Sequence, residues 1–300
     1  MRILLAVDGS LSSDRATELV STFPLPPESV IRVVAVQQPF VDVLAMSWAS
    51  VGELGIGDET EEEQDARHLK KAIERAEIAL KRPDLTLEGF IVRGRPASAI
   101  VDEAGAMKAD LVVLGSRGHG TIATMVLGST ASEVVDHAPC PVLVARSGTL
   151  GTVALADDGS PSARSAESVV ATWPLFADRE ISVVAVAEVG VPVAAGFTPG
   201  LYDQVLGSYT RSVDQARQEV AEASQSVANR LSDAGLRATP VVLEGDPAAE
   251  IVRCATERRT GTIVMGTRGR TGLARLVLGS VARNVLVHAP CSVLIVRERP

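Results

Sequence analysis

One stretch of this chain occurs twice. Residues 113–146 align without a gap with residues 264–297, and 18 of the 34 aligned positions are identical. The shared strings include HAPC at residues 137–140 and 288–291. Self-similarity of this density indicates duplication of a whole structural unit. The chain is therefore expected to contain two copies of the same fold.

Length and composition fit two globular domains. The chain has 300 residues, and about 150 residues per copy is a common size for a domain with its own core. Hydrophobic residues make up 46% and charged residues 22% of the chain, which is ordinary for a globular protein. We therefore predict one domain at residues 1–147 and a second at residues 148–300.

Charge and aromatic content argue against nucleic acid as a partner. The net charge is −8 and aromatic residues make up 3%, whereas nucleic-acid affinity comes from clustered Lys and Arg and from aromatic stacking. The apolar start of the chain is interrupted at Asp8, too early for a signal-peptide core. No apolar run approaches the roughly 20 residues of a membrane span. We expect a cytoplasmic protein that does not enter a membrane.

Short apolar runs alternate with helical patterns in both copies. The runs are apolar on both faces, as in buried parallel strands. Expected strands are Ile3–Val7, Val30–Val36, Leu87–Val92, Leu111–Leu114, Val142–Ala145, Val153–Ala156, Ile181–Val186, Pro240–Leu243, Thr262–Met265 and Val293–Val296. Expected helices are Ser12–Thr22, Glu61–Arg82, Pro96–Met107, Leu127–His137, Ala163–Thr172, Ser208–Asp233, Ala248–Glu257 and Leu278–His288. This order predicts an α/β fold of two tandem doubly wound domains, each a five-stranded parallel sheet with helices on both faces.

Two segments fit neither pattern. Pro39–Gly57 and Val189–Gly207 both follow the second strand of their copy and mix Gly and Pro with bulky apolar residues. Both exceed the usual loop length. They could be lids over a site or interface elements, and the sequence favours neither.

A glycine pattern connects the fourth strand of each copy to its last helix. It consists of Gly, two residues, Gly, nine residues, Gly and Ser. Glycine permits a sharp turn and lets main-chain amides approach a phosphate, and the last glycine precedes a helix whose N-terminal amides attract an anion. The residues are Gly115, Gly118, Gly128 and Ser129 in the first copy and Gly266, Gly269, Gly279 and Ser280 in the second. We predict two phosphate-binding loops; the alternative is that these glycines only form tight turns.

Charged residues surround this pattern. Arg117, His119, Arg268, Arg270 and Arg275 lie in the same loops and could neutralise a phosphate. Asp8 and Asp158 lie at the ends of the first strands, which meet the fourth strands where the strand order of such a sheet reverses. Each carboxylate could accept a hydrogen bond from a purine amine or a ribose, or could form an Asx-turn before the next helix.

Other chemistries lack their motifs. The chain has no Gly-Lys dipeptide, so the Walker loop is absent, and no Cys and His cluster has zinc spacing. His137 and His288 are expected to interact with helix C-termini, and His68 to lie on a solvated, charged helix face. Cys140 and Cys291 are expected to be small buried hydrophobic residues.

These residues resemble the ATP-binding branch of the universal stress protein family. That branch has the same glycine pattern, and both copies satisfy it. The Val7–Ser10 turn, Gly94-Arg95-Pro96 and the HAPC segments also match. The resemblance implies a strand order of 3-2-1-4-5 in each domain, with the nucleotide across the ends of the first and fourth strands.

The resemblance also implies the site residues and the assembly. Adenine contacts fall to Asp8, Asp158 and the main chain of Val36 and Val186. Phosphate and ribose contacts fall to Gly115, Gly118, Gly128, Ser129 and Thr130, and to Gly266, Gly269, Gly279, Ser280 and Val281. A divalent cation, Mg²⁺ or Mn²⁺, would be held mainly by the phosphates. Family members pair through their last strands, which implies an internal pseudo-dimer and a homodimer of the whole chain.

The function implied is nucleotide-dependent regulation in a stress response, through partners and with at most slow ATP hydrolysis. No residue stands out as a catalytic base, and phosphoryl transfer needs more than a cradle for the ground state. An ATPase and a structural module with empty sites are the alternatives. Asp157 replaces Val7 in the second copy and adds a carboxylate beside Asp158. We expect this pair to disfavour an anionic ligand in the second site.

Overall fold

The computed structural model describes residues 1–38, 61–118, 127–188, 199–269 and 278–297, with backbone alone at residues 61 and 199–212. The first half alternates strands and helices as predicted. Its elements are β1 (Arg2–Ala6), α1 (Leu11–Ser21), β2 (Ser29–Gln37), α2 (Glu61–Leu80), β3 (Leu85–Arg93), α3 (Pro96–Ala106), β4 (Leu111–Gly115), α4 (Ser129–His137) and β5 (Val142–Ala145).

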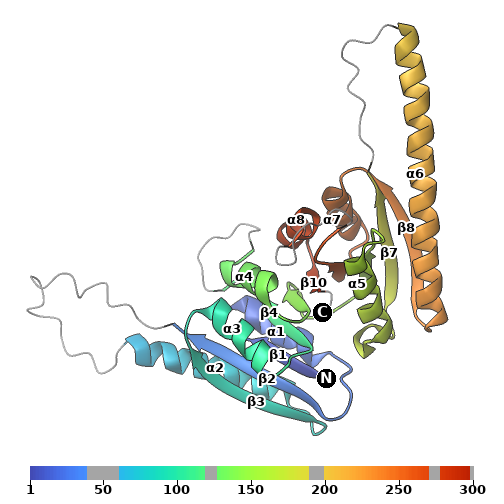
Figure 1. The fold of residues 1–300 in the computed structure, drawn as a ribbon. Coiled ribbons are helices and arrows are strands. Elements are labelled where there is room, and N and C mark those ends of the chain that lie inside the picture. Colours follow the sequence, from blue (N-terminus) through green and yellow to red (C-terminus); the bar gives the residue numbers. More distant parts are fainter. Residues whose placement is uncertain (39–60, 119–126, 189–198, 270–277, 298–300) are drawn as a thin grey trace, which may run out of the picture.

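The second half repeats this order with one addition, the short 3-10 helix η2. Its elements are β6 (Val153–Ala156), α5 (Pro161–Thr172), η2 (Pro174–Phe176), β7 (Glu180–Ala187), α6 (Pro199–Asp233), β8 (Arg237–Glu244), α7 (Pro247–Glu257), β9 (Thr262–Gly266), α8 (Ser280–His288) and β10 (Ser292–Val296). Figure 1 shows the two halves, with α6 extending well past the ends of β7 and β8.

The ten strands among the described residues form one sheet. Its order is β3-β2-β1-β4-β5-β10-β9-β6-β7-β8, so each half has the predicted order 3-2-1-4-5. Pairing is parallel within each half and antiparallel between β5 and β10, where Leu143 lies opposite Leu294. The last strands therefore pair within the chain, as the internal pseudo-dimer requires.

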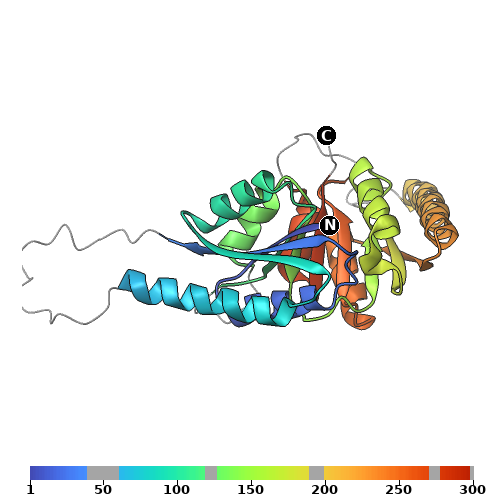
Figure 2. The ribbon, with the colours of Figure 1, turned by 90° about the horizontal axis from the view of Figure 1, so that it is seen from below.

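The sheet lies between two layers of helices. One core cluster joins α1, α2, α5 and α6 to one face, and a second joins α3, α4, α7 and α8 to the other. Figure 2 shows these layers in the first half, with α2 on one side of the strands and α3 and α4 on the other. The strand residues alternate between the two clusters because successive side chains in a strand point to opposite faces.

Local signals place several helix ends. Ser10 and Ser160 are the N-caps of α1 and α5, where each side chain accepts a hydrogen bond from a first-turn amide. Helices α3 and α7 have proline in the first turn, where the missing N–H costs nothing. Each of these helices therefore begins soon after the preceding strand ends, at the same edge of the sheet.

Two arginines cross the junction between the halves in a reciprocal way. Arg146, which follows β5, donates to the main-chain oxygens of Leu286 (2.5 Å) and Cys291 (3.3 Å) at the end of α8. Arg297, which follows β10, donates to those of Val135 (2.7 Å) and Asp136 at the end of α4. Each guanidinium thus meets the negative end of a helix in the other half.

One long segment differs from its expected form. Pro199–Gly207, expected to be part of an irregular connection, is the beginning of α6. Residues 189–198 of that connection lie outside the described residues, as does all of Pro39–Gly57. The prediction that these segments cover a site or an interface is therefore untested there. Within the described part, no helix is both long and apolar enough to cross a membrane.

Candidate functional site

A cavity of about 780 Å³ opens at the carboxyl ends of β1 and β4 in the first half. Its size suits a small-molecule ligand, and it lies where the strand order reverses. The structure brings all seven residues predicted for this copy to its lining: Asp8, Val36, Gly115, Gly118, Gly128, Ser129 and Thr130. Arg117 also lines it, while His119 lies outside the described residues.

Asp8 connects the end of β1 to the loop after β4. Its Oδ1 accepts a hydrogen bond from the Ser10 amide (2.9 Å), which is the Asx-turn that the sequence left open as an alternative role. Its Oδ2 faces Gly118, where an added Cβ would approach to 2.7 Å. Glycine at residue 118 therefore lets the carboxylate and the loop main chain lie side by side at the cavity.

The two ends of the glycine loop are held together. The Gly128 amide donates to the Ser116 oxygen (2.9 Å), so the start of α4 lies beside the end of β4. The Ser10 hydroxyl donates to the Arg117 oxygen (3.3 Å) and ties the same loop to the start of α1. This bracing fixes the rim of the cavity on both sides of residues 119–126, which the structure does not describe.

Helix α4 begins at the cavity without a capping side chain. Its N-cap is Gly128, which makes no side-chain cap hydrogen bond, in contrast to the serines before α1 and α5. The first amides of a helix have no partner within the helix. At Ser129 and Thr130 the helix therefore presents amides and its positive end to the cavity, which is chemistry that favours an anion.

Part of the cavity wall was missed from the sequence. Helix α2 contributes Asp65, His68 and Leu69, and α3 contributes Pro96 and Ile100. A helix that follows a strand begins at the carboxyl edge of the sheet, so first-turn residues lie near a ligand there. This rule could have found Pro96. The helix expected at Glu61–Arg82 begins where α2 begins, but its sequence did not show that this end lies at the cavity.

His68 has a second neighbour besides solvent. Its side chain is exposed, as predicted, yet its ring lies so close to Gly9 that a Cβ there would collide with Nε2. The histidine therefore covers the turn that carries Asp8. It belongs to the rim of the cavity as well as to a solvated helix face.

The second half repeats the contacts of the first. The Ser160 amide donates to Asp158 Oδ1 (3.0 Å), and the Gly279 amide donates to the Thr267 oxygen (2.8 Å). An added Cβ on Gly269 would approach Asp158 Oδ2 to 2.8 Å. An added Cβ on Gly266 would approach Ser162 as closely as one on Gly115 would approach Ser12.

The remaining predicted residues of the second half also occupy equivalent places. Helix α8 begins at Ser280 with Gly279 as an uncapped N-cap. Val186 and Val281 pack against the same core cluster. Three arginines were predicted to supply positive charge here. The main-chain oxygen of Arg268 accepts a hydrogen bond from the Ser160 hydroxyl (3.1 Å), while Arg270 and Arg275 lie outside the described residues.

The two cradles differ in cover. Asp8 is half-buried, but Asp158 is exposed. A Cβ on Gly159 would meet no described atom within 4 Å, whereas His68 stands over the equivalent Gly9. The second cradle is therefore more open on the side that α2 covers in the first.

Asp157 does not take the place that we expected. It lines a separate groove between α5 and α6, while Asp158 faces Gly269. Adjacent strand residues point to opposite faces, so the two carboxylates do not share the second cradle. Asp157 therefore does not line the second cradle, and its expected effect on an anionic ligand there stays a prediction.

The histidine and cysteine predictions outside the cradles are confirmed. His137 Nδ1 contacts the Glu133 oxygen (2.8 Å) and His288 Nδ1 the Asn284 oxygen (2.9 Å), each at a helix C-terminus. Cys140 and Cys291 are buried free thiols, and burial raises the pKa of Cys291 to about 11. No group of three or more potential protein ligands for a metal occurs among the described residues.

Comparison with known proteins shows the same duplication. The sequence model of the Universal stress protein family matches residues 1–146 and again residues 150–297. Universal stress protein Rv2005c of Mycobacterium tuberculosis is 28% identical over 306 residues, covering 99% of this chain and 97% of that protein. A Thermus aquaticus universal stress protein is 35% identical over 150 residues, covering 48% of this chain and 97% of its own.

Solved structures agree on the fold. A universal stress protein from Archaeoglobus fulgidus aligns over 100% of this chain and 98% of its own, with a TM-score of 0.65 and 18% identity. At that identity the likeness concerns the fold alone. The double match of the family model carries the assignment: the chain belongs to the universal stress protein family, as a tandem member with two domains.

Proposed function

We propose that this protein binds ATP in the cradles at the ends of β1 and β4 and of β6 and β9, and regulates a stress response through partners. The observation that carries the proposal is the lining of the first cavity. Seven residues from four separate parts of the sequence surround one space of about 780 Å³. Tight turns alone would not require that convergence.

The described residues fit an adenine nucleotide. Gly118 leaves a space beside Asp8 that a Cβ would fill, and the uncapped start of α4 offers amides to phosphate oxygens. Asp8 and the Val36 main chain would contact the base, and Gly115, Gly128, Ser129 and Thr130 the ribose and phosphates. A bound triphosphate would bring its own divalent cation, Mg²⁺ or Mn²⁺.

The proposal is one of binding and regulation, with at most slow hydrolysis. Self-association of the chain and a cytoplasmic location stay predictions. Sedimentation of the purified chain, with and without ATP, would measure the first.

Thermal unfolding of the full chain with ATP and Mg²⁺ tests the proposal. A ligand at about 100 times its Kd stabilises the native state by about 2.7 kcal/mol, so ATP should raise the midpoint in a saturable way. Gly118→Glu should place a carboxylate in the first cradle and remove most of this shift. Gly269→Glu should remove the contribution of the more open second cradle.

Gly105→Glu is the matched control. Gly105 lies on α3, and a Cβ there would meet no described atom within 4 Å. This variant should keep the full response to ATP. The proposal would be refuted if millimolar ATP left the unfolding midpoint of the wild-type protein unchanged. It would also be refuted if ATP raised the midpoint of a variant carrying both Gly118→Glu and Gly269→Glu as much as that of the wild type.

A further inference from the structure

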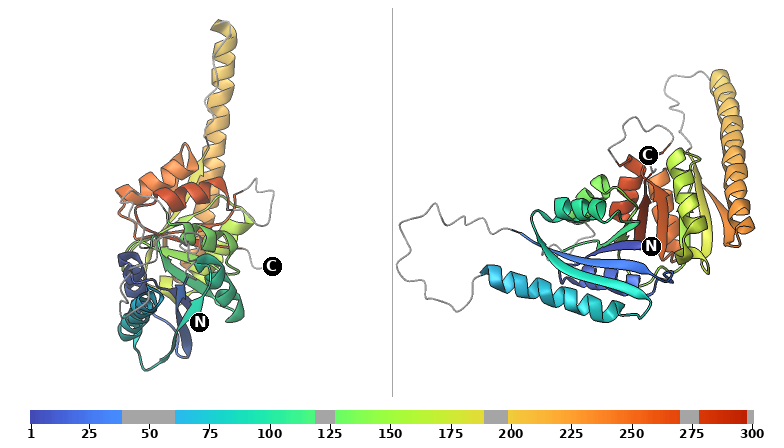
Figure 3. Two further views of the ribbon diagram at one scale, coloured as in Figure 1. Left: turned by 90° about the vertical axis from the view of Figure 1, so that its left-hand side faces the viewer. Right: turned by 60° about the horizontal axis from the view of Figure 1, so that its bottom comes forward.

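Helix α6 extends far beyond the sheet on which it packs. Arg217 pairs with Glu244, the last residue of β8 (3.0 Å), so residues 199–216 of the helix lie past the end of that strand. At 1.5 Å per residue this projecting part is about 27 Å long. In the first half, Glu62, the second residue of α2, already pairs with Arg93 at the end of β3 (2.8 Å). Figures 1 and 3 show α6 projecting away from the rest of the described molecule.

The projecting part of α6 needs packing to be stable in water. Isolated helices of about 12 to 15 residues are marginal, because most helical stability in proteins comes from packing of an apolar face. Gly200 and Gly207 weaken this part further. Among the described elements α6 packs mainly on β7 and β8, which do not reach it. A second helix from outside the chain would supply the missing packing.

The sequence of α6 has the repeat of a coiled coil. Apolar residues recur at alternating intervals of four and three residues, which places them along one face of the helix. We call this face the α6 seam; it consists of Tyr202, Leu206, Tyr209, Val213, Ala216, Val220, Ala223 and Val227. Val227 is buried in the core under the helix, whereas Val213 and Val220 are only half-buried. The face that packs on the sheet therefore continues into the projecting part.

The charge of the projecting part favours a protein partner over a membrane. Helices that lie on membrane surfaces are rich in Lys and Arg, but residues 199–216 contain one arginine, no lysine and two aspartates. A second copy of this chain brings the same apolar seam. The last strands β5 and β10 already pair with each other within the chain, so two chains need another surface on which to associate.

Two copies of the seam fit each other when the helices are antiparallel. One register sets a large residue opposite a smaller one at each layer, as good packing requires. The layers are Tyr202 with Val220, Leu206 with Ala216, and Tyr209 with Val213. The same register places Asp203 of each copy across from Arg217 of the other, at positions where charges select the partner orientation. A parallel arrangement would set tyrosine against tyrosine and leave Arg217 without a carboxylate across the seam.

We propose that two copies of this chain associate through the α6 seam, with their projecting helices antiparallel. Arg217 is exposed, and its guanidinium has donors for a second carboxylate besides Glu244. None of the seam residues is among the predicted nucleotide residues, so this interface does not depend on nucleotide binding. It gives residues 199–207 the interface role that the sequence left open.

Sedimentation equilibrium of the full chain without nucleotide tests the interface. The wild type should reach twice the mass of one chain. Val213→Glu would bury a charge in the seam and should weaken the dimer by at least about tenfold. Val213 lies beyond the sheet, so this variant should keep the fold of both halves. Gln215→Glu adds the same charge at an exposed position outside the seam and should dimerise as the wild type does.

Thiol cross-linking tests the antiparallel register. In this register the two copies of Thr210 lie next to each other beside the seam, so Thr210→Cys should give a covalent dimer with bismaleimidoethane. Ser208→Cys, on the side of the helix away from the seam, is the matched control and should give none. The wild type should give none either, because its three cysteines are buried.

Three results would overturn the proposal. They are a monomeric wild type, dimerisation of Val213→Glu equal to that of the wild type, and equal cross-linking of Thr210→Cys and Ser208→Cys. A monomeric chain that binds phosphatidylglycerol vesicles, and loses this binding in Val213→Glu, would assign the seam to a membrane surface instead. Each of these outcomes leaves the response to ATP untouched, so failure of the interface is distinct from failure of the proposed nucleotide site.

Discussion

At the scale of the residue, position in the strand decides what a carboxylate does. Asp8 and Asp158 were predicted at the cradles and lie there. Asp157 follows the same strand as Asp158 but faces the other side of the sheet. Both carboxylates were correctly predicted to follow the first strand of the second half. The sequence did not reveal the face of Asp157, because the strand ends there and the pleat direction depends on the packing of α5 and α6.

Asp157→Val should stabilise the protein, and more so at neutral than at acidic pH. Burial, as the largest cause, raises the pKa of Asp157 above its ordinary value. The folded state then holds a proton that the unfolded state has released, so stability falls as pH rises from the ordinary pKa through the raised one. Below the ordinary pKa both states are protonated and this loss vanishes.

The measurement is urea unfolding of both proteins at pH 4 and pH 7.5. We expect valine to add about 1 to 2 kcal/mol at pH 7.5, a typical cost of burying a polar group, and less at pH 4. An advantage of valine that is larger at pH 4 would contradict this account of Asp157.

At the scale of the element, alternation of apolar runs and helical patterns predicted nearly all of the described fold. The exceptions have physical reasons. Gly200 and Gly207 suggested a loop because glycine is a poor helix former, yet both lie in α6. The short η2 follows Trp173 at a proline, a position where sequence indicates only a turn. The start of α2 was predicted correctly at Glu61, but the packing that brings Asp65, His68 and Leu69 to the cavity wall leaves no local sequence signal.

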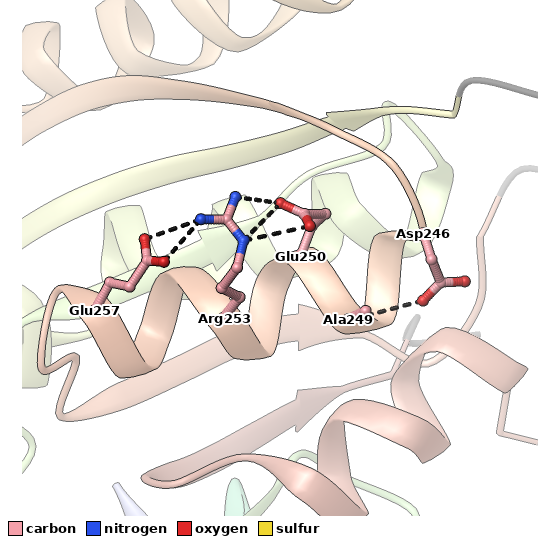
Figure 4. A network of polar contacts seen from close by, with 5 residues as sticks. All are labelled: Asp246, Ala249, Glu250, Arg253 and Glu257. Carbon is pink, nitrogen blue, oxygen red and sulfur yellow. Dashed lines mark hydrogen bonds and ion pairs between the residues drawn. The ribbon is translucent and has the colours of Figure 1, made fainter.

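Helix α7 has both an N-cap hydrogen bond and a set of surface ion pairs (Figure 4), so their contributions to stability can be compared within one helix. Asp246 caps its N-terminus by accepting from the Ala249 amide (2.9 Å). Arg253 pairs with Glu250 and with Glu257 (2.8 Å) on the exposed side of the same helix, and hydrogen bonds to both carboxylates raise its pKa. Exposed pairs within one helix contribute little, because water already solvates both groups.

Asp246→Ala should therefore lower the free energy of unfolding by about 1 kcal/mol, the typical contribution of an N-cap. Arg253→Met should leave it unchanged within error, although it removes two ion pairs. Urea titrations of the two variants decide the point. A greater loss from Arg253→Met than from Asp246→Ala would show that the surface network, and not the cap, stabilises α7.

At the scale of the whole molecule, the duplication builds one sheet from two halves. Pairing of the last strands was an expectation from family resemblance, and the register of β5 with β10 agrees with it. The reciprocal arginines were not foreseen. Arg146 and Arg297 are equivalent in the repeat, but sequence does not show that each reaches the helix of the other half.

Removing both arginines should weaken the coupling of the halves. Arg146→Met with Arg297→Met leaves partly buried carbonyl oxygens at the ends of α4 and α8 without these donors, at a cost of up to about 1 to 3 kcal/mol for each site. Scanning calorimetry should show a lower midpoint and a broadened or divided transition. Arg253→Met is the arginine control within one half, and if the double variant unfolds as this control does, the arginines do not couple the halves.

Binding of ATP in the cavity at the ends of β1 and β4 is the step on which the proposed function depends. A crystal structure of the full chain grown with ATP and Mg²⁺ measures this directly. We predict density for the phosphates beside Gly118, Gly128 and Ser129, and for adenine between Asp8 and Val36. A cavity without nucleotide density at saturating ATP, or nucleotide bound elsewhere on the chain, would contradict the account.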